Sequence, residues 1–323
     1  MTPLIRALAA SSGLSAADTL KLVRDAPDRY KVFTIEKRRG DERREIAQPA
    51  SEVKYLQRIL AEILLENLPI HDAATAYRKG HSLLDNALPH AGLGRPILKM
   101  DLRKFFPSIR SRDWESYCLK NAIFSDVQDA YLSSRLLFHR PIGGRVLRLA
   151  IGAPTSPMLS NILMYEFDNL VADIVGQDHV TYTRYADDMT FSAERTGFLV
   201  NVKKQVSRII RNMDYPKLDI NRQKTVYATA KYHREITGLV LANDGRVTVG
   251  RDKKRLIYSI VYRFLNNELD AAETQRLAGI LAFVKSAEPA FLDAIDGKYG
   301  EGTVSKVRSS AGRMHVADRR AYR

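Results

Sequence analysis

The stretch Tyr182-Thr183-Arg184-Tyr185-Ala186-Asp187-Asp188-Met189-Thr190-Phe191-Ser192 decides the fold of this 323-residue chain. Aromatic residues, Thr and small residues flank an Asp-Asp pair, which predicts two short strands joined by a tight turn. Asp tolerates the backbone of such a turn, so a solvated turn with two acids is the plain alternative. Two adjacent carboxylates repel each other, however, and a fold that keeps them at a hairpin tip usually has a compensating cation.

A third carboxylate decides between these alternatives. Residues 95–102 form a short, mostly apolar segment that predicts a strand, and Asp101 interrupts it. A carboxylate in such a strand is costly to bury unless it is paired or bound to a metal, although a strand-end Asp can also face water. If Asp101 meets Asp187 and Asp188, the three acids suit Mg²⁺, which combines carboxylates with water or substrate phosphates.

The composition favours a polyanionic partner. Lys and Arg exceed Asp and Glu by 51 − 37 = 14, and the estimated pI is about 9.8. This charge is spread along the whole chain, which favours nucleic acid over a membrane surface. No apolar stretch approaches the roughly 20 residues that span a bilayer, and the N-terminus does not resemble a signal peptide. The single cysteine, Cys118, fits a reducing, cytoplasmic setting.

Periodicity and turn residues predict most of the remaining elements. The expected helices cover residues 1–30 with a start at Ser15, 51–68 with Ser51 as N-cap, 111–138, 158–175, 200–213 and 252–299. The expected strands cover residues 30–37, 45–49, 95–102, 235–241 and 246–249, the last two joined by a turn at residues 243–245. Residues 301–323 are basic and poor in apolar side chains, so we expect a mobile, RNA-touching or disordered tail.

Two loops have both a plain and a functional interpretation. The basic tip between the first two strands is either a solvated turn or a clamp over a triphosphate. The small-residue loop at 151–157 either only turns the chain or lets a nucleotide approach the backbone closely. His71, His81 and His90 lack the spacing of a zinc site, so they are expected to be structural or RNA-facing.

In this order the chain resembles the retron reverse transcriptases of bacteria, over roughly residues 30–300. Four segments look like consecutive palm motifs of that family: Asp101-x-x-x-Phe105-Phe106-Pro107-Ser108, Gly152-Ala153-Pro154-Thr155-Ser156-Pro157 with Asn161, Tyr185-Ala186-Asp187-Asp188, and Leu218-x-x-Asn221-x-x-Lys224-Thr225. Order and spacing together are far more specific than any single motif.

Two further segments point to the retron type. Residues 86–90 match the retron signature Asn-Ala-x-x-His, and Ile236-Thr237-Gly238 lies where these enzymes usually carry Val-Thr-Gly. The length leaves no room after the helical thumb for the maturase or endonuclease domains of group II intron proteins. One departure is Ile151, where many reverse transcriptases place a nucleotide-contacting Gln; nearby backbone groups are the expected substitutes.

The resemblance implies an α+β, right-hand polymerase-like fold with fingers, a palm of antiparallel sheet plus helices, and a small helical thumb. The expected regions are N-terminal helices and fingers (1–97), the first catalytic palm strand (98–110), a fingers insertion (111–150), the palm with the catalytic hairpin and a primer-grip-like hairpin (151–245), a helical thumb (246–300) and a basic tail (301–323).

The resemblance also implies roles for individual residues. Asp101, Asp187, Asp188 and the backbone carbonyl of Leu102 are expected to hold two Mg²⁺ ions, which Mn²⁺ could replace. Lys224 is either a general acid for the departing pyrophosphate or a solvated lysine. The expected nucleotide-binding residues are Lys37, Arg44, Phe105, Phe106, Ile151 and Gly152, with Phe106 against the 2′ position of the sugar. The expected RNA- or primer-binding residues are Asn86, His90, Ser156, Pro157, Asn161, Thr237 and Gly238.

The implied reaction is reverse transcription of a structured non-coding RNA that serves as template and primer. Deoxynucleoside triphosphates are the substrates, a guanosine 2′-hydroxyl is the primer, and the product is a branched RNA–DNA, or msDNA. The resemblance further implies an anti-phage unit with a separate effector protein. The alternatives are a reverse transcriptase of diversity-generating or abortive-infection type, and a non-catalytic RNA-binding module on the same fold.

Overall fold

The computed structural model describes residues 1–36 and 43–321, which form two compact units. Unit 1 contains residues 1–78, 98–191 and 197–226, and unit 2 contains residues 79–97, 192–196 and 227–323. Both combine helices with small sheets, so the chain has the expected α+β class. The division into fingers, palm and thumb at the expected bounds stays a prediction, because compactness alone does not test what each region does.

The elements follow the chain in an irregular α and β order. The strands are β1 (Tyr30–Glu36), β2 (Arg43–Pro49), β3 (Ile97–Leu102), β4 (Thr181–Tyr185), β5 (Asp188–Ser192), β6 (Ile220–Ala228), β7 (Glu235–Ile236), β8 (Leu239–Leu241) and β9 (Val247–Thr248). The α-helices are α1 (Pro3–Ser12), α2 (Ala16–Asp25), α3 (Ser51–Ile63), α4 (Leu83–Ala87), α5 (Phe105–Ser108), α6 (Ser111–Lys120), α7 (Val127–Leu137), α8 (Ser156–Leu163), α9 (Tyr165–Gly176), α10 (Val202–Asn212), α11 (Arg251–Leu265), α12 (Ala271–Ala287), α13 (Ala290–Tyr299) and α14 (Thr303–Ala321). Four short 3-10 turns are η1 (Ala26–Asp28), η2 (Leu65–Asn67), η3 (Leu88–His90) and η4 (Thr196–Leu199).

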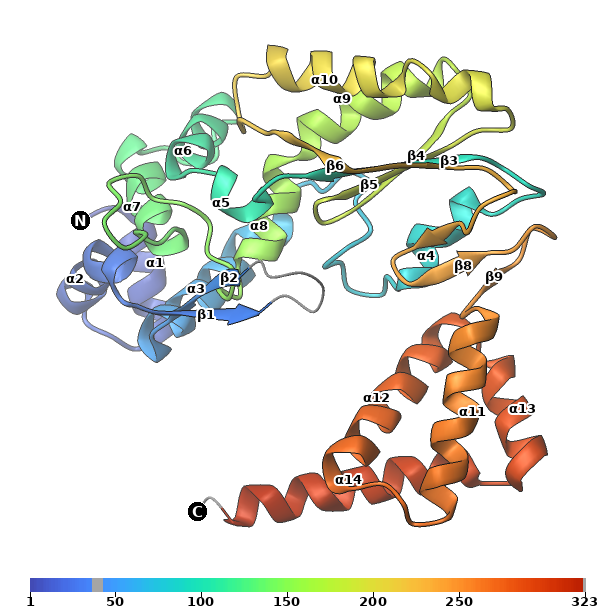
Figure 1. Cartoon of the computed structure of the whole chain (residues 1–323). Coiled ribbons are helices and arrows are strands. Elements are labelled where there is room, and N and C mark those ends of the chain that lie inside the picture. The colour runs from blue at the N-terminus through green and yellow to red at the C-terminus, as the bar shows by residue number, and fades with distance from the viewer. Residues whose placement is uncertain (37–42, 322–323) are drawn as a thin grey trace. The chain divides into compact units, whose positions relative to one another are not determined.

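The central sheet of unit 1 has the strand order β4-β5-β3-β6. Helix α9 packs against β4 and α10 packs against α9, so both lie on one side of the sheet (Figure 1). The predicted hairpin is confirmed: β4 and β5 flank a two-residue turn. Ala186, with φ of 58°, takes the left-handed position of that turn. Sequence reasoning had expected an Asp to tolerate it, so that detail is wrong.

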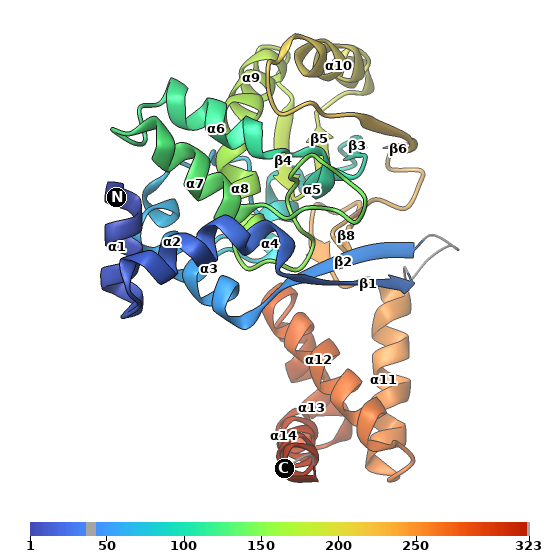
Figure 2. The same cartoon turned by 90° about the vertical axis from the view of Figure 1, so that its left-hand side faces the viewer.

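The hairpin of β1 and β2 extends from the N-terminal helices (Figure 2). Its strands pair antiparallel from Tyr30↔Pro49 to Glu36↔Arg43, and the N–H of Ala47 also donates to the Ile151 carbonyl at 2.9 Å. The predicted helix at 51–68 ends earlier, at Ile63, and its N-cap is Ala50. Ser51 is therefore the first helical residue, and the prediction that it caps the helix is wrong.

Unit 2 contains a three-stranded sheet in the order β7-β8-β9. The predicted single strand at 235–241 is wrong, because Thr237 and Gly238 have φ of 47° and 87° and turn the chain back between β7 and β8. The predicted turn at residues 243–245 is confirmed, since Leu241 pairs with Val247 across it. Side chains from helices α4 and α12 and from strands β7, β8 and β9 share one apolar core.

A helical bundle of α11, α12, α13 and α14 completes unit 2 (Figure 1). The prediction of a mobile or disordered tail at 301–323 is wrong for most of its length, because α14 runs from Thr303 to Ala321. Val304 and Val307 are buried in the same apolar cluster as Leu277 and Leu281 of α12. These buried residues dock a basic helix against the bundle. In the described ranges no helix combines the length and apolar character of a membrane span.

Candidate active site

The hairpin tip and strand β3 bring three carboxylates together. Asp101 lies near the end of β3, Asp187 lies in the turn, and Asp188 begins β5, the hydrogen-bonded neighbour of β3. The N–H of Leu102 donates to the Asp187 carbonyl at 2.9 Å, which fixes the tip beside the end of β3. Residues 86 positions apart in sequence thus meet at one edge of the sheet, as the polymerase interpretation requires.

The three acids are electrostatically coupled. Burial, followed by the neighbouring charges of Asp188 and Asp101, raises the pKa of Asp187 to about 6. The Asp188 side chain is exposed, yet partial desolvation by its surroundings, followed by Asp101, raises its pKa as well. Raised pKa values in a cluster of carboxylates indicate that their negative charges are not fully neutralised by nearby cations. The donor set therefore fits a hard, oxygen-seeking divalent cation.

Lys224 neutralises part of the negative charge of the three acids. Its Nζ, on β6, lies 2.9 Å from Asp101 Oδ2, and this hydrogen bond raises the pKa of Lys224. In residues 1–36 and 43–321 no three acidic, His or Cys side chains form a ready metal-binding group. Cation binding at Asp101 therefore has to compete with the Lys224 ammonium. A raised pKa makes Lys224 a weaker acid while it is paired with Asp101, so its role as general acid stays a prediction.

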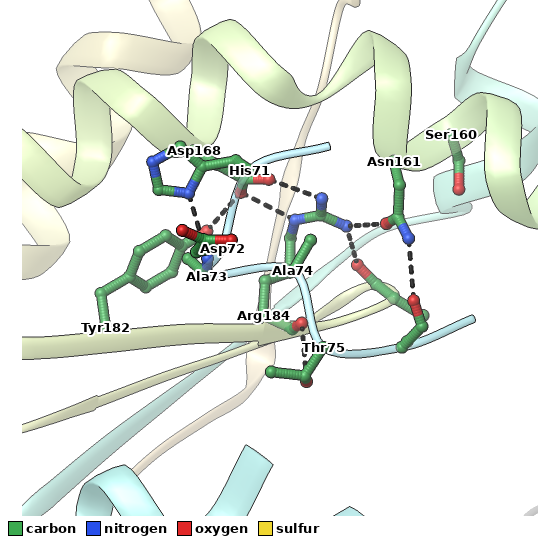
Figure 3. Close-up of polar contacts among 12 residues, drawn as sticks. His71, Asp72, Ala73, Ala74, Thr75, Ser160, Asn161, Asp168, Tyr182 and Arg184 are labelled. Atoms are coloured by element: carbon green, nitrogen blue, oxygen red, sulfur yellow. Dashed lines mark hydrogen bonds and ion pairs between the residues drawn. The ribbon is translucent and has the colours of Figure 1, made fainter. Parts of the chain in front are cut away.

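A buried polar cluster supports the hairpin from the side of helices α8 and α9 (Figure 3). Arg184 of β4 and Asp168 of α9 are fully buried and joined by an ion pair of 2.6 Å. Asn161 of α8 accepts from Arg184 and donates its Nδ2 to the Ala76 carbonyl at 2.8 Å. Asn161 is therefore engaged on both sides of its amide, and its expected contact with RNA or primer is corrected to a structural one.

An aromatic group lies near the acidic hairpin tip. The Tyr77 ring is 6.3 Å from the Phe106 ring and 6.4 Å from the Tyr185 ring. Burial first, and then the charge of Asp187, raises the pKa of Tyr77. Sequence reasoning missed Tyr77, and its only signal was an aromatic residue before the basic pair of residues 78–79.

Three of the expected nucleotide-binding residues, Arg44, Phe105 and Phe106, can be compared with this group. The pKa of Tyr77 is raised mainly by burial, and the positive charge of Arg44 on β2 opposes that shift, so Arg44 is electrostatically coupled to Tyr77. Lys37 lies outside the described residues. Phe106 is half-buried and can present its ring to a sugar, whereas Phe105 is 3% exposed and packs below Arg184. The expected contact of the Phe105 side chain with nucleotide is therefore corrected to a core contact.

The loop at residues 151–154 lies against β2. Gly152 has φ of 125°, and a Cβ there would come within 2.9 Å of the Ala47 carbonyl oxygen and 3.2 Å of Ile46 Cγ2. The positive φ and the lack of space for a Cβ atom both favour glycine at this position. Ile151 is half-buried and uses its carbonyl to bind Ala47, while the Gly152 backbone is exposed. Position 151 has no Gln side chain, and the exposed backbone of Gly152 beside it is available for a polar contact.

The remaining residues that were expected to bind RNA or primer are of two kinds, buried and partly exposed. Asn86, His90 and Ser156 are 1%, 0% and 1% exposed, so their side chains are corrected to core positions. His90 Nδ1 lies 2.8 Å from Ser192 Oγ, and burial lowers the pKa of His90 to about 3, so the ring is neutral. The partly exposed residues Pro157, Thr237 and Gly238 keep their expected role as a prediction.

Comparison with known proteins agrees with this geometry. The profile of the family described as "Reverse transcriptase (RNA-dependent DNA polymerase)" matches residues 35–241. The Retron Ec83 reverse transcriptase of Escherichia coli is 35% identical over 281 residues, covering 86% of this chain and 89% of that protein. The chain belongs to the retron reverse transcriptases. The Retron Ec86 reverse transcriptase of Escherichia coli is 28% identical over 310 residues, covering 91% and 90% of the two chains.

This retron reverse transcriptase is accordingly an RNA-directed DNA polymerase that works on an RNA partner. Among solved structures, apo telomerase from Candida tropicalis is similar with a TM-score of 0.49 and 11% identity, covering 88% of this chain. The retron reverse transcriptase spans 62% of that telomerase chain.

Proposed function

We propose that this enzyme copies a structured partner RNA into DNA with deoxynucleoside triphosphates, in a reaction centred on Asp101, Asp187 and Asp188. The observation that carries the proposal is the convergence of Asp187 with Asp101 across β5 and β3, with a hydrogen bond of 2.9 Å from Leu102 N–H to the Asp187 carbonyl. Phosphoryl transfer needs positioned charge more than covalent chemistry, and this edge concentrates it.

We assign the divalent ions, Mg²⁺ in the first instance, to these three acids together with the Leu102 carbonyl. When bound, two such ions supply activation of the attacking hydroxyl and stabilisation of the leaving pyrophosphate. Arg44 holds the triphosphate, for which the planar guanidinium is well suited. Phe106 lies against the sugar and excludes a 2′-hydroxyl sterically. Lys224, released from Asp101, neutralises the charge that develops on the leaving group.

We also propose a priming mode, which membership of the retron reverse transcriptases supports. A guanosine 2′-hydroxyl within the partner RNA starts the DNA strand, and the product is a branched msDNA. The formal charge of +14 suits an RNA that is bound by shape and phosphate contacts. We further propose that the complex works with a separate effector protein in defence against phage.

The central test is primer extension on poly(rA)/oligo(dT) with purified chain and defined metal. We expect incorporation of dTTP that needs Mg²⁺ or Mn²⁺ and is lost in Asp187→Asn. Incorporation that persists in Asp187→Asn would remove the acids from the chemistry. A folded chain that binds RNA but incorporates nothing under any metal would favour the non-catalytic RNA-binding alternative.

The retron-specific steps need a second test. The chain is expressed with its flanking genomic DNA, and the co-purified nucleic acid is sequenced before and after treatment with a 2′–5′ debranching enzyme. One structured RNA joined to a short DNA, with a mobility shift on debranching, is expected. Unbranched cDNA from a variable repeat would instead favour the diversity-generating alternative. Loss of phage resistance on removing a neighbouring gene tests the effector.

A further inference from the structure

Each of the three guanidinium nitrogens of the buried Arg184 donates a hydrogen bond. Its Nε and Nη2 donate to Asp168 Oδ1 and Oδ2 at 2.8 and 2.6 Å. Its Nη1 donates to Asn161 Oδ1 at 3.2 Å and to the Ala186 carbonyl at 2.9 Å. Tyr182 donates its hydroxyl to Asp168 Oδ1 at 2.8 Å. Figure 3 shows this guanidinium between the helix layer and the hairpin.

The contact with Ala186 reaches the hairpin tip itself. Ala186 holds the left-handed position of the turn, with φ of 58°, and is bonded directly to Asp187. A non-glycine residue persists in that conformation only when its surroundings fix it. The Arg184 side chain supplies such a fixing contact from inside the protein. The Leu102 N–H, at 2.9 Å from the Asp187 carbonyl, holds the next residue from the β3 side.

The backbone of Arg184 is fixed as well. Its N–H donates to the Ala73 carbonyl at 2.7 Å, and its carbonyl accepts from Thr75 N–H at 2.9 Å. The end of β4 is therefore held at its outer edge by residues 73–75, and the tip is held by the guanidinium from the side of helix α9. Asp168 neutralises the cation, so Arg184 works through geometry and adds no net charge near the acids.

Resting on the proposed metal role of the three acids, we propose that Arg184, with Asp168 as its counter-ion, is a positioning residue that sets the orientation of Asp187 through the Ala186 carbonyl. The guanidinium is fully buried, so the role that we propose for it is indirect. Its contribution is therefore to the binding of the divalent ion and to the chemical step. Supporting contacts of this kind typically change metal affinity or activity by about 10–100-fold.

Arg184→Lys tests the role with the least change in charge. A lysine can still pair with Asp168, but a single ammonium cannot also reach Asn161 and the Ala186 carbonyl in the same fork geometry. We expect a folded protein with Mn²⁺ binding weakened about tenfold or more, measured by electron paramagnetic resonance without nucleotide. In primer extension kcat is expected to fall by a similar factor while KM for dTTP changes little.

Two matched controls separate positioning from general structure. Tyr182→Phe removes one hydrogen bond from Asp168 but leaves the contact with Ala186, so Mn²⁺ binding is expected to stay within twofold of the wild type. Glu166→Gln removes an exposed ion pair with Lys120 from the same helix, α9, and is expected to be silent. If Tyr182→Phe weakens Mn²⁺ binding as much as Arg184→Lys, the effect comes from the whole cluster and the proposal fails.

A second variant covers the case in which Arg184→Lys does not fold. Replacing the buried pair by apolar side chains, in Tyr182→Phe/Asp168→Leu/Arg184→Met, leaves no unpaired charge, and such replacements are often neutral for stability. This folded variant is also expected to lose Mn²⁺ affinity and kcat. If either folded variant binds Mn²⁺ and turns over like the wild type, Arg184 has only a structural role. If wild-type Mn²⁺ binding is itself unchanged by Asp187→Asn, the proposed metal role fails instead.

Discussion

At the scale of single residues, the charged side chain of Asp187 lowers the stability of the folded protein. Its pKa is raised from 3.8 to about 6, first by burial and then by the charges of Asp188 and Asp101. A carboxyl that binds its proton more tightly in the folded state destabilises the fold above pH 6, where it is charged in both states. This penalty disappears as the pH falls through 6 toward 3.8, because the folded state then takes up the proton first.

Asp187→Asn is therefore expected to stabilise the metal-free protein. We expect a gain of about 1–2 kcal/mol at pH 7.5, which is less than the full shift of two pKa units because the site is partly solvated. The gain should shrink between pH 6 and pH 4. Thermal unfolding in EDTA at several pH values measures it. The exposed Asp173→Asn on α9 serves as the control, and a lower melting temperature for Asp187→Asn at pH 7.5 contradicts the argument.

Phe106 is the residue that we expect to select the sugar. Its half-buried ring lies beside Tyr77 at the acidic tip, whereas the neighbouring Phe105 is in the core. Phe106→Ala should open space for a 2′-hydroxyl and raise the ribonucleotide-to-deoxyribonucleotide ratio of kcat/KM by at least tenfold, worth about 1.4 kcal/mol. Primer extension with matched rNTP and dNTP measures the ratio. Unchanged sugar selectivity would take Phe106 out of this role.

At the scale of elements, the site depends on the contact between β2 and the loop at residues 151–154. Gly152→Ala would drive a Cβ into the Ala47 carbonyl, which is a backbone atom and cannot move away cheaply. We expect about 1–3 kcal/mol of destabilisation. Because Arg44 lies on the same strand as Ala47, a displaced β2 should also raise the KM for dNTP more than it lowers kcat.

Gly143→Ala is the matched control for that variant. Gly143 also has a positive φ, of 70°, but a Cβ there meets nothing within 4 Å. It therefore carries the backbone strain without the collision. Thermal unfolding and steady-state kinetics of both variants separate the two effects. Equal losses in the two variants would mean that backbone strain, and not the contact with β2, limits position 152.

At the scale of the whole molecule, net charge governs RNA binding. An excess of 14 positive charges predicts binding driven mainly by release of counterions from phosphates. If about six to ten phosphates are neutralised, affinity should fall roughly 10³–10⁵-fold between 50 and 200 mM salt. Filter binding of the partner RNA against salt measures the slope, and an RNA with methylphosphonate linkages is the control. Binding that is insensitive to salt would contradict a phosphate-based interface.

Much of this molecule follows from local sequence. The Asp-Asp turn, the turn at residues 243–245 and the helices after residue 251 were all predicted, because each depends on neighbouring residues and their period. The single helix predicted at residues 158–175 is two helices, α8 and α9. The order of the palm motifs also identified the family. The turn at Thr237-Gly238 was missed, because the apolar residues on both sides fit a continuous strand equally well.

The sequence by itself determined the three acids, the family and the basic character of the protein. Only the tertiary structure decided which polar side chains face a substrate and which are buried: Asn86, His90 and Asn161 belong to the core, while Tyr77 lies at the site. It also paired Arg184 with Asp168 and Lys224 with Asp101. The physical reason is that the environment of a side chain is set by segments far away in the chain, whose packing no local pattern encodes.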